Sequence, residues 1–372
     1  MKIGVPKETM AGERRVALVP DVAKSMLKNE QLEVVIEAGA GDAAGHPDSQ
    51  YEAAGAKVVQ GDALSGADVV LHVAVPTAEE IAKLSSGQIL ISHLNPWVSA
   101  ETNNALAQAG VTAFAMEAIP RTTRAQAMDA LSSQAAAAGY AAMLIAARES
   151  GRFFGMMTTA AGTVPPAKVL VLGAGVAGLQ AVATGKRLGA IVTGFDIRRA
   201  AWEQIASLGG RPLELDFIPD AEGEGGYARP LTDEENAQVR DALTANAAKQ
   251  DIIVTTAAIP GRPAPLLITA DAVRAMSPGS VIVDLAAETG GNCELTQAGE
   301  TVVENGVKVL GPRNLASEMP APASQLYAKN LENLLGLMVS EEGKLELNWE
   351  DDILAAAVIT EGGAVKNERA AK

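Results

Sequence analysis

Residues 168–197 read KVLVLGAGVAGLQAVATGKRLGAIVTGFDI: an apolar strand, a glycine-rich turn, an amphipathic helix and a second apolar strand. Gly173, Gly175 and Gly178 have the spacing GxGxxG directly after the first strand. In this pattern the first glycine permits a tight turn, the second lets a pyrophosphate approach the backbone, and the third lets helix and strand pack closely. The start of the helix offers free N–H groups and the positive end of its dipole to phosphates. The stretch therefore predicts a dinucleotide-binding Rossmann unit.

Asp196 ends the second strand of this stretch. A carboxylate about twenty residues after the glycines can accept hydrogen bonds from the adenosine ribose. Its charge would repel the 2′-phosphate of NADP, so NAD(H) is the favoured nucleotide. Arg198 and Arg199 follow closely and could instead clamp a 2′-phosphate or lie in solvent. The alternative to the whole interpretation is a glycine-rich turn in an α/β fold without a ligand.

Composition limits the other classes of function. At 372 residues the chain is long enough for two domains. Its formal net charge of −15 argues against nucleic acid and against anionic lipid headgroups as partners. Cys293 is the only cysteine, so no internal disulfide can form, and no ligand cluster supports a metal site.

The sequence also bears on location. No uninterrupted apolar run reaches the roughly 20 residues that a membrane-spanning helix needs. The opening, MKIGVPKETM, lacks the apolar core of a secretory signal. We therefore expect a cytoplasmic protein without direct membrane insertion.

Short runs rich in Val and Ile alternate with helical stretches along the whole chain. The expected strands are 2–6, 33–39, 68–75, 88–94, 111–117, 167–175, 191–197, 251–257, 280–286 and 307–311. Strands that alternate with helices indicate parallel pairing with helices on both faces of the sheet. We predict an α/β fold of two doubly wound Rossmann-like domains, with a ligand cleft between them.

Long helices are expected to join the two domains. Residues 130–149 are rich in Ala and contain no Pro, and residues 323–339 carry apolar side chains at helical spacing. We place the N-terminal domain at 1–130 plus about 325–372, and the NAD(H)-binding domain at 131–324.

Three segments resemble one known family. They are PRTTRAQAMDALSSQAAAAGY (120–140), the glycine-rich stretch with its preceding AAGTVPPA, and DLAAETGGNCELT (284–296). Together they resemble the NAD(H)-binding domain of proton-translocating nicotinamide nucleotide transhydrogenase. The similarity runs from the opening KIGVPKE to about Lys329. Alanine dehydrogenase shares the fold and the N-terminal motif, and is the alternative family.

The resemblance implies a reaction and partners. NADH bound here would pass hydride directly to NADP bound on a separate subunit, coupled to proton movement through a membrane domain. No membrane helices follow within the sequence, so it resembles the split form with a soluble NAD(H) subunit. The implied partners are NADP(H)-binding and membrane-spanning subunits, with peripheral association at the inner membrane. The resemblance also implies a homodimer.

The same resemblance assigns a loop to the nicotinamide end of the nucleotide. Its catalytic residues would be Arg121, Gln126, Asp129 and Ser132, with Thr122 and Thr123 binding cofactor. Gln126 and Asp129 would fall on one face of a helix, because side chains three residues apart are neighbours. The alternative is a helix N-terminus in which these residues act as caps.

Further nucleotide contacts follow from the resemblance. They are Val176 at the pyrophosphate, Ile197 and Arg198 beside Asp196, and Ala258 after the strand at 251–257. Residues 216–230 match the family's mobile loop, in which Gly226 and Tyr227 would cover the nucleotide. A solvated acidic loop is the alternative there. For Asp284 and Glu288, a nucleotide contact and turn capping both stay open.

The alanine dehydrogenase interpretation requires a proton donor and a cation near a carbonyl. The family's Lys and His positions hold Ala74 and Asn95 here, while His72 and His93 are each offset by two residues. We expect both histidines to be structural, although Arg15 matches the arginine that grips a pyruvate carboxylate in that family. Hydride transfer between two nicotinamides moves no proton, so it requires alignment and exclusion of water instead. A non-catalytic NAD sensor is a third hypothesis.

Overall fold

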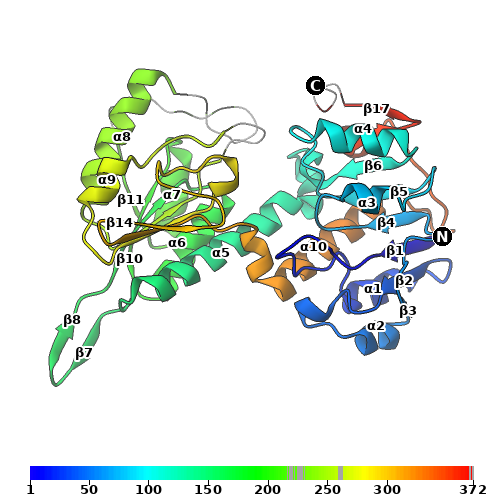
Figure 1. The fold of residues 1–372 in the computed structure, drawn as a ribbon, viewed down its shortest axis with the longest axis horizontal. Coiled ribbons are helices and arrows are strands. Elements are labelled where there is room, and N and C mark those ends of the chain that lie inside the picture. The colour runs from blue at the N-terminus through cyan, green and yellow to red at the C-terminus, as the bar shows by residue number, and fades with distance from the viewer. Residues whose placement is uncertain are drawn as a thin grey trace. The chain divides into compact units, whose positions relative to one another are not determined.

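The computed structural model describes residues 1–215, 217, 221, 223, 229, 231–258, 263–367 and 370. The chain forms two compact units (Figure 1). Unit 1 consists of Met1–Gln134 with Ser317–Lys372, and unit 2 of Ala135–Ala316. The chain therefore changes unit near residues 134 and 316, whereas the boundaries expected from the sequence lie at 130 and about 324.

Unit 1 is built on an eight-stranded sheet in the order β17-β16-β6-β5-β4-β1-β2-β3. Its parallel strands are β1 (Lys2–Val5), β2 (Glu33–Glu37), β3 (Lys57–Val59), β4 (Val69–Leu71), β5 (Ile89–Ser92) and β6 (Thr112–Ala115). At one edge β16 (Val358–Glu361) runs antiparallel to β6, and β17 (Ala364–Val365) antiparallel to β16. The first six strands lie in the order 3-2-1-4-5-6, which is the doubly wound Rossmann arrangement.

The two faces of this sheet bury separate apolar cores, because successive side chains of a strand point to opposite faces. Val69 and Leu71 of β4 belong to one core, and Val70 between them to the other. The first core is covered by α1 (Pro20–Met26), α2 (Asp48–Ala54), α10 (Pro320–Leu335) and α11 (Asp352–Ala357). The second is covered by α3 (Ala78–Ile81) and α4 (Ala100–Gln108).

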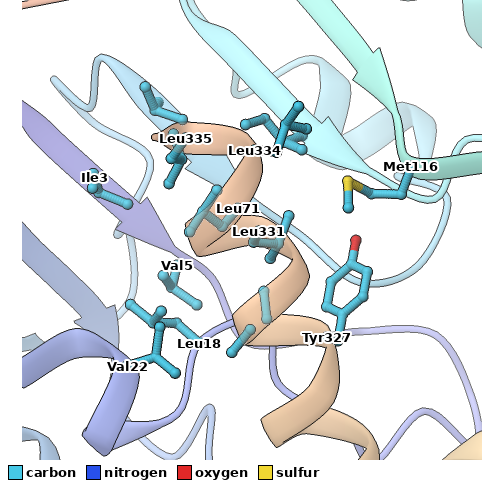
Figure 2. Close-up of a cluster of buried hydrophobic side chains, with 14 of the residues drawn as sticks. Ile3, Val5, Leu18, Val22, Leu71, Met116, Tyr327, Leu331, Leu334 and Leu335 are labelled. Carbon is cyan, nitrogen blue, oxygen red and sulfur yellow. The ribbon is translucent and has the colours of Figure 1, made fainter. Parts of the chain in front are cut away.

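Helix α10 supplies the centre of the first core. Figure 2 shows Leu331, Leu334 and Leu335 of this helix among side chains of the sheet. Tyr327 is fully buried beside them, and its hydroxyl donates to the carbonyl oxygen of His72 at 2.8 Å. Of the apolar residues whose spacing predicts this helix, Leu331, Leu334, Leu335 and Met338 are buried, whereas Leu326 is 43% exposed.

Unit 2 is built on a seven-stranded sheet in the order β11-β10-β9-β12-β13-β15-β14. Its parallel strands are β9 (Lys168–Leu172), β10 (Ile191–Phe195), β11 (Arg211–Pro212), β12 (Ile252–Thr255), β13 (Val281–Asp284) and β15 (Val307–Leu310). Strand β14 (Thr301–Glu304) is antiparallel to β15. The winding reverses between β9 and β12, as in a Rossmann sheet.

Helices cover both faces of the second sheet. Helices α8 (Asp233–Ala247) and α9 (Ala270–Ala275) share one core with strands β9, β12 and β13. Helix α6 (Val176–Arg187) contacts β9 and β10, and α7 (Ala200–Ser207) follows β10. The prediction of two doubly wound α/β units is confirmed. Strands β3, β11, β14, β16 and β17 were not expected from the sequence, nor was the hairpin formed by β7 (Met157–Thr159) and β8 (Gly162–Val164).

Helix α5 (Ala130–Ser150) begins in unit 1 and continues in unit 2. Within the part of the chain that the structure describes, it is long and apolar enough to cross a membrane by length and composition alone. Packing explains that composition, because Ala141, Ala142, Met143 and Ala146 are buried. Gly139 lies so close to α6 that an added Cβ would be 2.1 Å from the carbonyl oxygen of Ala177.

We predict that Gly139→Ala lowers the free energy of unfolding by about 1–3 kcal/mol, because the new methyl group overpacks the contact between α5 and α6. Gly336→Ala is the matched control, since Gly336 is exposed at the end of α10 and has a φ of −61°. Urea denaturation followed by circular dichroism measures both. An unfolding midpoint for Gly139→Ala equal to that of the control would contradict this contact.

Candidate functional site

The loop after β9 leaves open space at one of its three glycines. Gly173 has a φ of +94°, and its N–H donates to the carbonyl oxygen of Phe195 at 2.8 Å. A Cβ on Gly178 would lie 1.8 Å from the carbonyl oxygen of Gly173. A Cβ on Gly175 would meet nothing within 4 Å, and its φ of −75° is ordinary for any residue. Backbone conformation and close packing explain why positions 173 and 178 are glycines. At Gly175 neither applies, and the absence of a side chain leaves room beside the backbone.

The same loop ends at the N-terminus of α6. Gly175 is the N-cap residue, and Val176 is 43% exposed. No side chain of the described residues caps this helix, and its first turn carries no acidic residue. Unpaired N–H groups at the start of a 12-residue helix, together with its dipole, favour an anion.

The neighbouring loop after β12 is tied to the glycine-rich loop. The N–H of Thr256 donates to the carbonyl oxygen of Leu172 at 2.7 Å, and its hydroxyl donates to that of Gly173 at 3.0 Å. Both loops thus lie at the carboxyl ends of β9 and β12, where the winding of the sheet reverses. Ligands of open α/β sheets bind at this position. Ala258 is exposed in the second loop.

Asp196, directly after β10, is 7% exposed and points at the glycine-rich loop. One carboxylate oxygen accepts from the N–H of Ala174 at 2.8 Å. The guanidinium of Arg198 donates to both oxygens, at 2.8 and 2.9 Å, and the Arg198 N–H donates at 2.9 Å. Ile197 between them is half-buried. The structure brings the glycine-rich loop, Asp196 and Arg198 together; Arg198 is neither free in solvent nor positioned by the motif, but pairs with Asp196.

Asn292 holds the loop after β12, a role that was not predicted from the sequence. Its side chain accepts from the N–H of Ala257 at 3.1 Å and donates to the carbonyl oxygens of Ala257 and Pro265, both at 2.8 Å. In the sequence, the only indication of this role is that Asn292 follows two glycines in the segment ETGGN. Asn292 thus fixes the conformation of a loop at the predicted site.

Asp284 supports this arrangement from the end of β13. It is fully buried and accepts hydrogen bonds from the side chains of Thr255 and Thr296 and from the N–H groups of Ala286, Asn292 and Cys293. Of the two alternatives left open for Asp284, the structure therefore supports turn capping. Glu288 accepts from the N–H of Asn314 at 3.2 Å.

The predicted nicotinamide loop lies in unit 1. Residues Thr123–Met128 form a 3₁₀ helix, followed by α5. Asp129 accepts from the N–H of Ser132 at 2.9 Å and from its hydroxyl at 2.6 Å, so these two residues do form a helix cap. Arg121, Thr122, Thr123 and Gln126 are exposed.

The scaffold of this loop comes from the C-terminal part of unit 1. The guanidinium of Arg124 donates to both carboxylate oxygens of Asp351, at 2.7 and 2.9 Å. Those hydrogen bonds lower the pKa of Asp351 to about 2. The side chain of Asn330 donates to the carbonyl oxygen of Ala127 at 2.9 Å. The loop is held by these contacts and by buried Ala125 and Met128, which leaves its other polar side chains on the surface.

His72 is the centre of a buried ionic cluster at the carboxyl ends of β1 and β4. Its Nδ1 lies 3.4 Å from the carboxylate of Glu8, and its Nε2 lies 3.6 Å from that of Glu80. Burial alone would lower the pKa of His72, but the charges of Glu8 and Glu80 raise it to about 9. Burial raises the pKa of Glu8. Burial also opposes ionisation of Glu80, but the neighbouring His72 and hydrogen bonds from Thr77 and Thr9 lower its pKa to about 2.

The other groups considered for acid–base chemistry are also paired within unit 1. His93 lies 3.5 Å from the carboxylate of Glu117 and stacks on Tyr327 with ring centroids 5.0 Å apart. Arg15 forms two hydrogen bonds with the Glu13 carboxylate, at 2.6 and 2.8 Å. Both histidines thus have structural partners, as expected. The predicted lid residues Gly226 and Tyr227 lie outside the described residues.

Comparisons with known proteins agree with this geometry. The family description "Alanine dehydrogenase/PNT, N-terminal domain" matches residues 4–138, and the corresponding C-terminal domain matches residues 142–368. A relative from Rhodospirillum rubrum, named as one piece of NAD(P) transhydrogenase subunit alpha, is 47% identical over 375 residues. That match covers 98% of this chain and 97% of the relative.

Two further comparisons separate the branches of the family. The crystal structure of transhydrogenase from Sinorhizobium meliloti matches with a TM-score of 0.90 and 46% identity, over 98% of this chain and 100% of that chain. Alanine dehydrogenase of Bacillus subtilis is 28% identical over 100% of this chain and 94% of the relative. The chain therefore belongs to the alanine dehydrogenase/PNT family and, within it, to the NAD(P) transhydrogenase alpha subunits.

Proposed function

We propose that this chain is the NAD(H)-binding subunit of a proton-translocating transhydrogenase. It binds NADH and passes hydride directly to NADP⁺ on a partner subunit. The observation that carries the proposal is the open backbone at Gly175 beside an uncapped helix N-terminus, in a chain nearly half identical to a transhydrogenase alpha subunit. Phosphates fit that place because N–H groups and the helix dipole converge there.

Hydride transfer fits the groups that unit 1 offers. NADH gives up a hydride and becomes NAD⁺, while NADP⁺ takes it up and becomes NADPH, so no proton is exchanged at the reacting carbons. His72, His93 and Arg15 are engaged with carboxylates, as a reaction without acid–base catalysis allows. Exposed Arg121 and Gln126 supply a guanidinium and an amide for orienting the dihydronicotinamide, and Asp129 and Ser132 shape the loop. In such a reaction, alignment of the two nicotinamide rings is the main contribution to rate acceleration.

The proposal includes the partners. The Rhodospirillum rubrum relative is named as one piece of an alpha subunit, so it belongs to a larger assembly. We propose that NADP(H)-binding and membrane-spanning subunits complete the enzyme. This chain then lies on the cytoplasmic side of the inner membrane and is attached through those partners.

Gly175→Ala tests the nucleotide site without disturbing the fold. We expect it to weaken NADH binding at least tenfold, because the methyl group fills the space left for the pyrophosphate, while the unfolding midpoint stays unchanged. Isothermal titration calorimetry measures the affinity. Gly155→Ala is the matched control in the same unit, since its Cβ would meet only ordinary contacts at 3.5 Å or more. Equal affinities for both variants would place the pyrophosphate elsewhere.

Gln126→Leu tests the nicotinamide loop. With the membrane and NADP-binding partners present, we expect the rate of hydride transfer from NADH to an NADP⁺ analogue to fall about tenfold to a hundredfold, because misalignment slows transfer. NADH affinity and stability should change little, since the side chain is exposed. Gln108→Leu, at an exposed position of α4, is the control.

The outcomes separate the alternative functions. An unchanged rate for Gln126→Leu removes this residue from the proposed machinery. Turnover of pyruvate, ammonia and NADH by the chain alone would instead establish an alanine dehydrogenase. NADH binding without turnover, even with partners, would favour a sensor.

A homodimer is the remaining element of the proposal. Four large apolar side chains of the hairpin β7–β8 and the residues before it are exposed: Phe153, Met156, Met157 and Val164. Because a two-stranded hairpin alone is only marginally stable in water, we expect this apolar surface to be covered. In line with the resemblance, we propose that a second copy of this chain packs against these four side chains. Met156→Asp should shift the sedimentation profile from dimer to monomer, whereas Val303→Asp, at an exposed position of β14, should not. A monomeric wild-type chain would overturn the assignment.

A further inference from the structure

The carboxylate of Asp196 already accepts four hydrogen bonds within the chain. An ionised carboxylate offers about four acceptor positions. One oxygen accepts from the N–H of Ala174 and from Nη2 of Arg198, and the other from the N–H and Nε of Arg198. All four distances are 2.8–2.9 Å. A ribose hydroxyl must therefore compete with these four donors for the carboxylate.

The guanidinium of Arg198 is the donor that can leave. Two of the four donors are backbone N–H groups, one in the glycine-rich loop and one next to Asp196, so moving them requires moving the chain. The guanidinium is on a flexible side chain and is 20% exposed, against 8% for the Asp196 side chain. Its Nη2 also donates to the carbonyl oxygen of Ala174 at 3.3 Å, so it spans the carboxylate and the glycine-rich loop.

We propose that Arg198, which the resemblance gives as a nucleotide contact, is instead an intramolecular competitor for the adenosine ribose and thereby sets nucleotide affinity and selectivity. The inference rests on the proposed function and extends it to a state without nucleotide. In that state the guanidinium covers Asp196, and the ribose hydroxyls take the place of its two side-chain donors when NADH binds. The apparent affinity is then the intrinsic affinity reduced by the fraction of molecules in which Asp196 is uncovered.

Competition also changes which nucleotide is accepted. A covered Asp196 is neutralised by the guanidinium, so it repels a 2′-phosphate less than a bare carboxylate would. Removing the guanidinium should therefore strengthen binding of NADH and weaken binding of NADPH. A subunit that must release its nucleotide in each turnover gains from weakened binding of this kind.

Arg198→Ala is the direct test. We expect the dissociation constant for NADH to fall on the order of tenfold, since the competing state is removed. The ratio of NADPH to NADH dissociation constants should rise further. Arg198→Lys should give an intermediate affinity, because a single ammonium cannot hold both oxygens as a guanidinium does. Titration calorimetry with NADH, ADP-ribose and NADPH measures the series, with the thermal midpoint as a check on folding.

Two controls make the result specific. Arg199→Ala removes the same charge one position away, where the side chain lies over Trp202, and should change NADH affinity by less than about twofold. In an Asp196→Asn background the gain from Arg198→Ala should disappear, because the competed acceptor is gone. Weaker NADH binding by Arg198→Ala, or an equal gain in the Asn background, would overturn the inference while leaving the nucleotide site intact. Failure of the wild-type chain to bind NADH would overturn the proposed function instead.

Trp202 gives a second readout within the same site. Its Nε1 donates to the backbone carbonyl oxygen of Asp196 at 3.0 Å. Displacement of the guanidinium by ribose should change the fluorescence of Trp202 on NADH or ADP-ribose binding. The Arg198→Ala variant should already show the altered signal before ligand is added, and an identical signal in the two apo proteins would contradict competition at Asp196.

Discussion

The site in unit 2 depends on one close approach of backbone to backbone. A Cβ at Gly178 would lie 1.8 Å from the carbonyl oxygen of Gly173 and 2.9 Å from the hydroxyl of Thr256. Only a residue without a side chain allows α6 to start so near the ends of β9 and β12. Because of this close approach, the first turn of α6 lies at the carboxyl edge of the sheet. The anion-binding geometry is therefore a consequence of packing and is present before any ligand arrives.

Polar contacts extend this constraint to the neighbouring loops. Thr256 ties the loop after β12 to the glycine-rich loop, and Asn292 holds the same loop at Ala257. Asp284 fixes the backbone N–H of Asn292 in turn, at 2.8 Å. The fully buried Asp284 carboxylate is accommodated because five donors surround it, since a buried charge without partners would be costly. Three loops are thus preorganised, and the space at Gly175 remains open among them.

The sequence predicts those features that depend on neighbours along the chain. Val-rich strands, the GxGxxG turn and Asp196 all lie within one 30-residue stretch, so their spacing alone indicates the Rossmann unit. It does not predict the pairing of Glu8 with His72, the bond from Arg124 to Asp351, or the role of Asn292. Each of these depends on a partner that the fold brings from a distant part of the chain. The sequence also places Asp196 correctly without indicating that Arg198 occupies it.

The two units have related sheets but differ at the point where the winding of each sheet reverses. The six parallel strands of each sheet lie in the order 3-2-1-4-5-6, so both sheets have a reversal point at the carboxyl edge. In unit 1 the Glu8 carboxylate accepts from the N–H groups of Val73 and Ala74, at 2.7 and 3.2 Å. In unit 1 a carboxylate of the chain itself thus accepts from the backbone N–H groups that follow β4, and His72 lies beside it at 3.4 Å. The topology provides a reversal point in both units. In unit 1 side chains of the chain itself are paired there, whereas in unit 2 the backbone at Gly175 stays open.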